Sequence, residues 1–208
     1  MEGLSSAVRK AAYPVLFCLS VAAFIGGIVV LTIPLWSGWL NAQAQTRAAS
    51  AFARAQATPG VQTDILGRMT IPAIGVTTYV LQGLTFQPGP AGALLKQGPA
   101  HVVDSADPGQ DGNAVILGHL NVWGSVFLRL ARMRPGERIQ FETVSDVYTF
   151  AVTGLQTIPQ TDVAAVAPHG GPPTLQLVTC GGGWLDSTRV VVNAKLVSTT
   201  ARTSLQKV

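Results

Sequence analysis

Histidine is scarce in this chain, and an excess of basic side chains is absent from most of it. The chain carries 14 basic and 10 acidic residues, but the part from Val61 onward carries about equal numbers of each, so the net charge of +4 arises mostly near the N-terminus. This balance excludes a nucleic-acid-binding surface. The three histidines, His101, His119 and His169, lack the spacing of metal ligands. We therefore expect no metal site and no cofactor.

Charged residues are absent altogether from Ala11 to Thr46. Twenty apolar residues in a helix span the roughly 30 Å hydrocarbon core of a bilayer at about 1.5 Å per residue. Tyr13 lies at one end of the apolar run, and Trp36 and Trp39 lie at the other, where aromatic rings favour membrane interfaces. The pattern predicts a transmembrane helix over residues 11–36.

The alternative to a retained anchor is a cleaved signal peptide, because residues 42–44 resemble a small-residue cleavage site. An apolar run of about 20 residues is longer than the usual 7 to 15 of a signal sequence, and this favours the anchor. Arg9 and Lys10 precede the apolar run. By the positive-inside rule, residues 1–10 are then cytoplasmic, and the protein crosses the cell membrane once with its C-terminal domain outside the cell.

Cysteine is rarer still, and its two copies are far apart in the sequence. Cys18 lies inside the predicted membrane helix and Cys180 in the predicted external domain. A disulfide between them would require the domain to fold into the bilayer. We therefore expect Cys180 to remain a thiol, and a thiol outside the cell calls for a functional explanation.

The rest of the chain divides into a linker, a β-rich domain and a tail. Residues 37–63 are rich in Ala and Gln and predict a stalk, helical over 41–57. Residues 64–199 predict an all-β domain, a barrel or sandwich, followed by a C-terminal tail at 200–208. A helix is expected at 125–132. Short runs of high β propensity predict strands at 69–71, 77–81, 114–117, 138–141, 147–152, 175–179 and 189–197.

The residues that can carry chemistry stand at the ends of these strands. A cysteine with an ordinary pKa of about 8.5 needs a partner to become a thiolate. His119 can be that partner, as general base and then general acid. Arg189 can bind a substrate carbonyl or stabilise an oxyanion. Thr179 and Gly181, which flank Cys180, are candidate substrate-binding residues.

Each of these residues also fits a purely structural role. A single cysteine is often a small buried hydrophobe, a single arginine is often a solvated charge, and Thr179 is also a good packed strand residue. His101 and His169 lie in Gly/Pro-rich segments and are interpreted as loop residues, the latter as a possible border of a substrate groove.

The order of these residues resembles the sortase family of membrane-anchored cysteine transpeptidases. The resemblance covers about residues 64–199. It is carried by Gly118-His119, Thr179-Cys180-Gly181-Gly182 and Arg189, and by the segments 71–76, 108–113, 124–130 and 135–137.

The resemblance implies an eight-stranded β-barrel with short helices. It implies Cys180 as the nucleophile that forms a thioacyl intermediate, His119 as the acid/base partner and Arg189 as the substrate and oxyanion stabiliser. It also implies the partners: secreted proteins with a C-terminal sorting signal of Leu-Pro-x-Thr-Gly type, and an amine from a cell-wall precursor or a pilin lysine. The sequence from Gly181 to Trp184 is more similar to class F than to class A or B. It is also similar, to a lesser degree, to classes D and E.

Two other functions are compatible with a tethered β-domain. An L,D-transpeptidase is also a β-rich Cys/His enzyme, but that family has a His-Gly-x-x-Gly type of sequence around its cysteine, and no histidine follows His169 here. A non-catalytic β-barrel that binds cell-wall or protein ligands would not need cysteine, histidine and arginine together.

Overall fold

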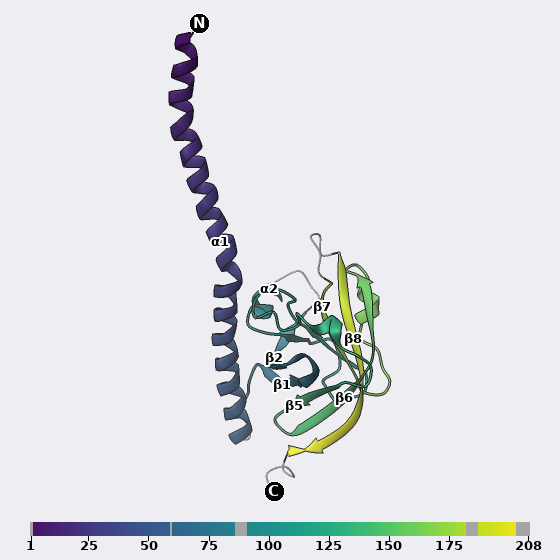
Figure 1. Ribbon diagram of the computed structural model, residues 1–208. Coiled ribbons are helices and arrows are strands. Elements are labelled where there is room, and N and C mark those ends of the chain that lie inside the picture. The colour runs from purple at the N-terminus through teal and green to yellow at the C-terminus, as the bar shows by residue number, and fades with distance from the viewer. Residues whose placement is uncertain (1, 59, 86–90, 182–186, 203–208) are drawn as a thin grey trace. The chain divides into compact units, whose positions relative to one another are not determined.

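The structure, a computed structural model, describes residues 2–58, 60–85, 91–181 and 187–202. It consists of two compact units, residues 1–36 and residues 37–208. Helix α1 (Glu2–Ala57) contributes residues to both units, and all strands belong to the second (Figure 1).

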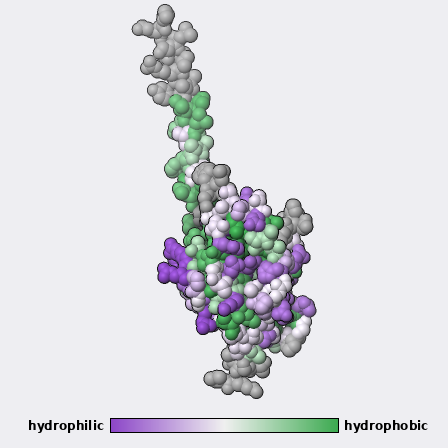
Figure 2. Space-filling model, turned by 90° about the vertical axis from the view of Figure 1, so that its right-hand side faces the viewer, coloured by the Kyte–Doolittle hydropathy of each residue, from purple (hydrophilic) through white to green (hydrophobic). Residues whose placement is uncertain are grey.

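The N-terminal unit is an apolar helix. Large apolar side chains from Val15 onward are exposed on all sides, Phe17 by 69% and Leu31 by 77%. They form the apolar surface that covers this part of the helix in Figure 2. The helix is long and apolar enough to cross a membrane, as the absence of charge predicts.

The second unit is a closed eight-stranded barrel, which confirms the predicted fold class. Its strands follow one another in the order β1-β2-β3-β4-β7-β8-β6-β5. Two of the pairings are parallel, β2 with β3 and β4 with β7. The strands are β1 (Ile65–Ile71), β2 (Val76–Leu84), β3 (Ala100–Val102), β4 (Asn113–Leu117), β5 (Arg138–Glu142), β6 (Asp146–Pro159), β7 (Thr174–Cys180) and β8 (Thr188–Ala201).

Two local features differ from the sequence predictions. Strand β3 was not predicted, because its three residues are too few to show alternation. The helix predicted at 125–132 is instead a series of turns that ends in the 3₁₀ helix η2 (Leu130–Arg132). The N–H groups of Leu128, Leu130 and Arg132 each donate to the carbonyl three residues back, whereas the Phe127 N–H donates to the His119 carbonyl. These three-residue hydrogen bonds take the place of the four-residue bonds of an α-helix, and Phe127 lies in the core. The remaining short helices are η1 (Pro72–Ile74), α2 (Ala91–Leu95) and η3 (Val163–Val166).

Two apolar clusters hold the barrel together, one on each side of the sheet. The first fills the barrel interior with residues from seven strands, and Phe127, Phe141 and Phe150 are fully buried within it. The second covers the outer face of β2, β3, β4, β7 and β8 and includes Val178 and Val191. Because side chains alternate along a strand, odd and even positions of β7 serve different clusters.

The segment predicted as a stalk packs against the barrel. Residues 37–57 are helical and belong to the same compact unit as the strands. Phe52 is 3% exposed, and its ring lies 5.7 Å from that of Tyr79. The Gln45 amide pairs with the backbone of Tyr79, accepting from N–H at 2.7 Å and donating to C=O at 3.2 Å. Burial of one helix face explains the difference, since Ala48, Phe52 and Ala55 recur at helical spacing within the alanine-rich run.

Candidate active site

Strands β4, β7 and β8 align the three predicted catalytic residues in one row. Cys180, the last residue of β7, is directly paired with Arg189 of β8. On the other side, β4 runs parallel to β7 with Leu117 paired to Val178. His119 follows β4 by two residues, and the Gly118 N–H next to it still bonds to the Val178 carbonyl of β7. Side-chain alternation puts Cys180 and Arg189 on the outer face, to which Val178 and Val191 also belong.

The ends of β4 and β7 are fastened together beside this row. The Gly118 N–H donates to the Val178 carbonyl at 3.0 Å, and the Thr179 hydroxyl donates to the Gly118 carbonyl at 2.9 Å. Thr179 is 3% exposed, so its side chain contacts other residues of the protein and not the solvent. Gly118 must lack a side chain because a Cβ there would lie 2.6 Å from the Phe127 ring. These contacts fix the backbone from which His119 and Cys180 project.

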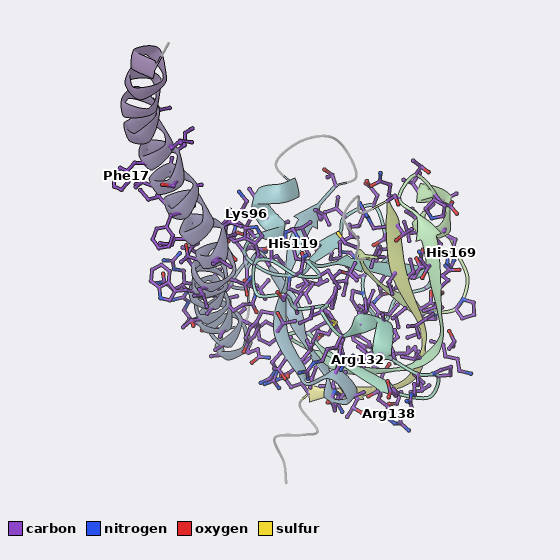
Figure 3. The ribbon with its side chains drawn as sticks, turned by 45° about the horizontal axis from the view of Figure 1, so that its top comes forward. Phe17, Lys96, His119, Arg132, Arg138 and His169 are labelled. Carbon is purple, nitrogen blue, oxygen red and sulfur yellow. The ribbon has the colours of Figure 1, made fainter. Side chains whose placement is uncertain are left out.

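His119 occupies a partly desolvated environment. Its Nε2 is buried and has no hydrogen-bond partner among the residues that the structure describes. Burial lowers the pKa of His119 below its usual 6.5, and the charge of nearby Lys96 lowers it further (Figure 3). A buried imidazole nitrogen without a protein partner is unusual in a folded structure and indicates a place where a ligand can bind.

The other end of the row is held by the connection between β6 and β7. Arg189 donates from Nη2 to Gln160 Oε1 at 3.4 Å and from Nη1 to the Thr188 carbonyl at 2.8 Å. Gly181 donates its N–H to the Thr188 carbonyl at 2.9 Å, and a Cβ at Gly181 would collide with the Thr188 hydroxyl. Gly181 is therefore required for close packing next to Cys180, and its expected contact with substrate stays a prediction.

A buried row of side-chain amides lies on the same face of the sheet, four residues before Cys180 along β7. Asn113, fully buried, donates to Gln176 Oε1 at 3.0 Å and to the Ala167 carbonyl at 3.2 Å. Gln176, 6% exposed, donates to Asn193 Oδ1 at 2.9 Å and to the Ala165 carbonyl at 3.3 Å. These bonds fasten residues 160–173 along the outer face of β4, β7 and β8. Sequence reasoning missed them, although a glutamine inside the apolar run of β7 was a visible signal.

The remaining histidines lie outside this row. His101 is fully buried, with Nε2 2.8 Å from the Ala106 carbonyl and Nδ1 3.1 Å from Gln82 Oε1, so it is a core residue and not the loop residue predicted. The His169 side chain is exposed, and the His169 backbone N–H donates to Asn113 Oδ1 at 2.8 Å. No group of metal-binding side chains occurs in the described part of the chain. Residues 182–184, which suggested the class, lie outside the described residues.

Comparisons with known proteins agree with this geometry. A model of the sortase domain matches residues 69–197. Sortase A of Bacillus anthracis is 29% identical over 140 residues, which cover 67% of this chain and 63% of that protein. The chain thus spans less than two thirds of that relative's length.

Solved structures show the same fold. A sortase D5 transpeptidase from Clostridium perfringens superposes with a TM-score of 0.65 at 22% identity, over 75% of this chain and 99% of that one. Sortase E from Streptomyces avermitilis superposes with a TM-score of 0.59 at 26% identity, over 68% and 93% of the two chains.

Proposed function

Because the chain belongs to the sortase family, whose members are cysteine transpeptidases, we propose that it transfers peptides with Cys180 as nucleophile, His119 as acid and base, and Arg189 as oxyanion stabiliser. One observation carries this proposal: the β4-β7-β8 ladder brings these three residues into one row at the strand ends. The L,D-transpeptidase alternative loses its support, since the family match is to sortases.

In the first half of the proposed reaction, the Cys180 thiolate attacks the carbonyl carbon of the scissile peptide bond. A C–S bond forms and the carbonyl oxygen becomes an oxyanion, which the Arg189 guanidinium stabilises. Collapse of this intermediate breaks the C–N bond, and protonated His119 gives its proton to the leaving amine. The products are a thioester on Cys180 and a released C-terminal fragment.

In the second half, an acceptor amine attacks the thioester carbonyl. Its proton passes to His119, a new C–N bond forms and the C–S bond breaks, which restores the thiolate and the protonated imidazole. The buried, unpartnered Nε2 of His119 supports this role, because it is available to the substrate's nitrogen. The lowered pKa of His119 makes its protonated form a stronger acid toward the leaving amine.

The proposed substrates are secreted proteins with a C-terminal sorting signal of Leu-Pro-x-Thr-Gly type, cleaved between Thr and Gly. The proposed acceptor is an amine of a cell-wall precursor or a pilin lysine. The helix at residues 11–36 is proposed to anchor the protein in the cell membrane, with its N-terminus cytoplasmic and the barrel outside.

The proposal is tested by incubating the full chain in detergent with quenched sorting-signal peptides, with and without hydroxylamine or triglycine as the amine. We expect cleavage that the amines accelerate, and a transfer product that carries the amine. Cys180→Ala should lower the rate by about a thousandfold or more. His119→Ala and Arg189→Ala should also lower it strongly, while Arg138→Ala on the exposed start of β5 serves as a control.

Equal cleavage by wild type and Cys180→Ala would refute the proposed nucleophile. No cleavage of any peptide with or without proline, together with tight peptide binding, would support the non-catalytic barrel instead. Cleavage only of peptides without the Leu-Pro pair would keep the transpeptidase and reject the proposed signal.

A further inference from the structure

The loop that follows His119 has a strained backbone. Trp123, Gly124 and Ser125 have φ angles of 51°, 86° and 48°, three consecutive residues in the left-handed region. Among the described residues, Trp123 and Ser125 are the only two with positive φ that are not glycine. Such conformations are unfavourable for ordinary residues and persist only when the surroundings impose them. Contacts from outside the loop must therefore hold it.

The strained residues are coupled to the backbone of His119. The Phe127 N–H donates to the His119 carbonyl at 3.1 Å, and the Phe127 ring packs against Gly118 and is fully buried. The Ser125 N–H donates to the Val122 carbonyl at 3.0 Å, which closes the turn between these points. A change in the loop conformation would therefore displace the residue from which the His119 side chain projects.

Two contacts hold the loop, and both lead to helix α1. The Lys96 ammonium lies 5.1 Å from the centroid of the Trp123 ring, a cation–π geometry. Asn41 of α1 donates from Nδ2 to the Lys96 carbonyl at 3.3 Å. The Asn41 side chain also occupies the space where a Cβ on Gly124 would be. Asn41 thus contacts both Lys96 and the loop.

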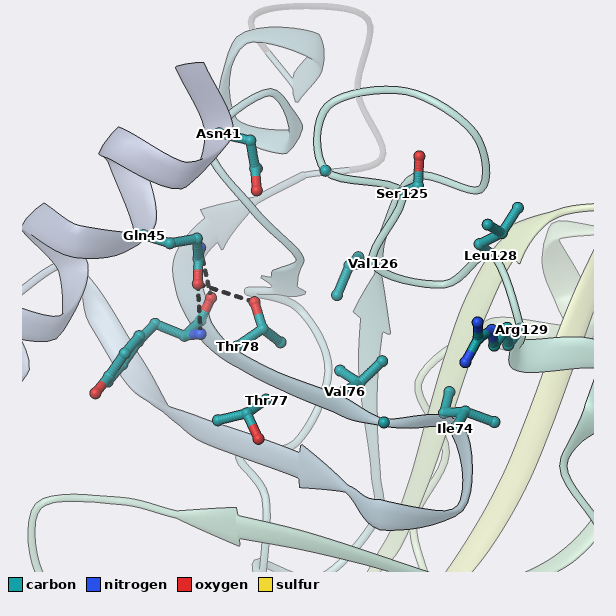
Figure 4. A pocket seen from close by; sticks show the side chains of 13 residues that line it. Asn41, Gln45, Ile74, Val76, Thr77, Thr78, Ser125, Val126, Leu128 and Arg129 are labelled. Carbon is teal, nitrogen blue, oxygen red and sulfur yellow. Dashed lines mark hydrogen bonds between the residues drawn. The ribbon is translucent and has the colours of Figure 1, made fainter. Parts of the chain in front are cut away.

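A groove of about 450 Å³ lies between α1, the start of β2 and the loop, and is lined by Asn41, Gln45, Thr78 and Ser125 among others (Figure 4). Gln45 crosses the groove one helical turn after Asn41. It accepts from the Thr78 hydroxyl at 2.9 Å and donates to the Gln97 carbonyl at 3.0 Å. Gln45 fixes the helix to the barrel, and Asn41 extends that support to the loop.

We propose that residues 37–57 are a working part of the catalytic unit, in which Asn41 and Lys96 act as positioning residues that hold the strained loop and thereby the His119 side chain. This inference rests on the proposed function of His119. Lys96, from the segment after α2, is the charged group whose field acts on His119, and Cys180 and Arg189 are paired at the neighbouring ends of β7 and β8. Lys96 contributes a charge as well as a contact, since it lowers the pKa of His119.

The test compares four variants of the full chain in detergent. Asn41→Ala removes the support, Lys96→Met removes the charge and keeps the length, and Lys96→Arg keeps the charge. Ser50→Ala is the control, because Ser50 is exposed on the same helix and donates only to Thr46 of its own helix. The readouts are kcat and KM for transpeptidation, the Tm, and the pKa of His119 from NMR titration of labelled imidazole.

We expect Asn41→Ala and Lys96→Met to lower kcat by roughly threefold to tenfold with little change in KM, the size expected for one lost hydrogen bond. The pKa of His119 should rise toward 6.5 in Lys96→Met, and Lys96→Arg should restore both values. The inference is overturned if Asn41→Ala and Lys96→Met match Ser50→Ala in kcat and in the titration. If the proposed function is wrong, the wild type will show no turnover. The NMR titration would still measure the effect of Lys96 on the pKa of His119 in that case.

Discussion

The two flanks of the candidate active site are held in opposite ways. On one flank, the β6–β7 connection is fastened by Asn113 and Gln176, whose amides are buried and fully hydrogen-bonded. On the other flank, the loop after His119 is strained and is held by Lys96 and Asn41, whose contacts are exposed. A buried amide network is rigid, because breaking one of its hydrogen bonds leaves a buried polar group unpaired and costs much free energy. Exposed contacts are individually weak. The β6–β7 connection is therefore the rigid flank, and the loop after His119 is the adjustable one.

The largest effect is expected on the rigid flank. Asn113→Ala removes three hydrogen bonds and leaves the Ala167 carbonyl, Gln176 Oε1 and the His169 N–H without their partner. We expect a loss of about 2–4 kcal/mol in the free energy of unfolding, measured by urea denaturation.

Asn113→Asp sharpens this prediction: it keeps an oxygen that accepts from the His169 backbone N–H but places a buried carboxylate against the Ala167 carbonyl and Gln176 Oε1, so we expect a loss at least as large. Gln156→Ala, at an exposed position of β6, is the control and should change stability by less than about 0.5 kcal/mol. If Asn113→Ala is as stable as the control, the amide row does not hold the connection.

A smaller effect is expected next to Cys180. Gly181→Ala introduces a Cβ that collides with Thr188, and we expect a loss of about 1–3 kcal/mol together with reduced transpeptidation. Gly154→Ala, where a Cβ would meet nothing within 4 Å, should be nearly neutral. Thr188→Ala in the same chain should restore part of the loss, and equal stability of the two single variants would contradict the packing described here.

On the adjustable flank, two glycines allow a matched comparison. Gly124 and Gly136 have φ angles of 86° and 90°, so alanine costs about 1–2 kcal/mol at either position. Only at Gly124 does a new Cβ meet Asn41, whereas at Gly136 it meets nothing within 4 Å. We expect similar Tm values for the two variants but lower kcat for Gly124→Ala alone. Equal kcat values would show that the loop does not act on His119.

The smallest effect is a dependence of stability on pH. Burial lowers the pKa of His101 and His119 below 6.5 in the folded state. Unfolded chains therefore bind protons first as the pH falls, so the free energy of unfolding should decrease below about pH 6.5 and level off below the folded pKa values. Replacing His101 by Gln should flatten this slope in denaturation curves between pH 7 and 5. An unchanged slope in the double variant that also carries His119→Gln would contradict the lowered pKa values.

The sequence pattern predicted an all-β domain, seven of its strands and the apolar helix, because these depend on alternation and on long uncharged runs, and the family resemblance implied the closed barrel. It did not predict β3, whose three residues carry no period, or the packing of residues 37–57, because an alanine-rich helix has a weak apolar face. The row of His119, Cys180 and Arg189 was expected from family resemblance, and its physical basis lies in strand register. Register depends on the pairing of segments that are distant in the sequence. The contacts of Asn113, Gln176 and Asn41 could therefore not be predicted from the sequence alone.

The proposed chemistry depends on a covalent bond at one sulfur atom, and the mass of the acyl-enzyme tests it most directly. Full-length protein would be mixed with a sorting-signal peptide without added amine, quenched in acid and measured intact, then digested. We predict a gain equal to the peptide up to its threonine, located on Cys180 and not on Cys18, and reversed by hydroxylamine. Cleavage of the peptide with no adduct on Cys180 would contradict the account.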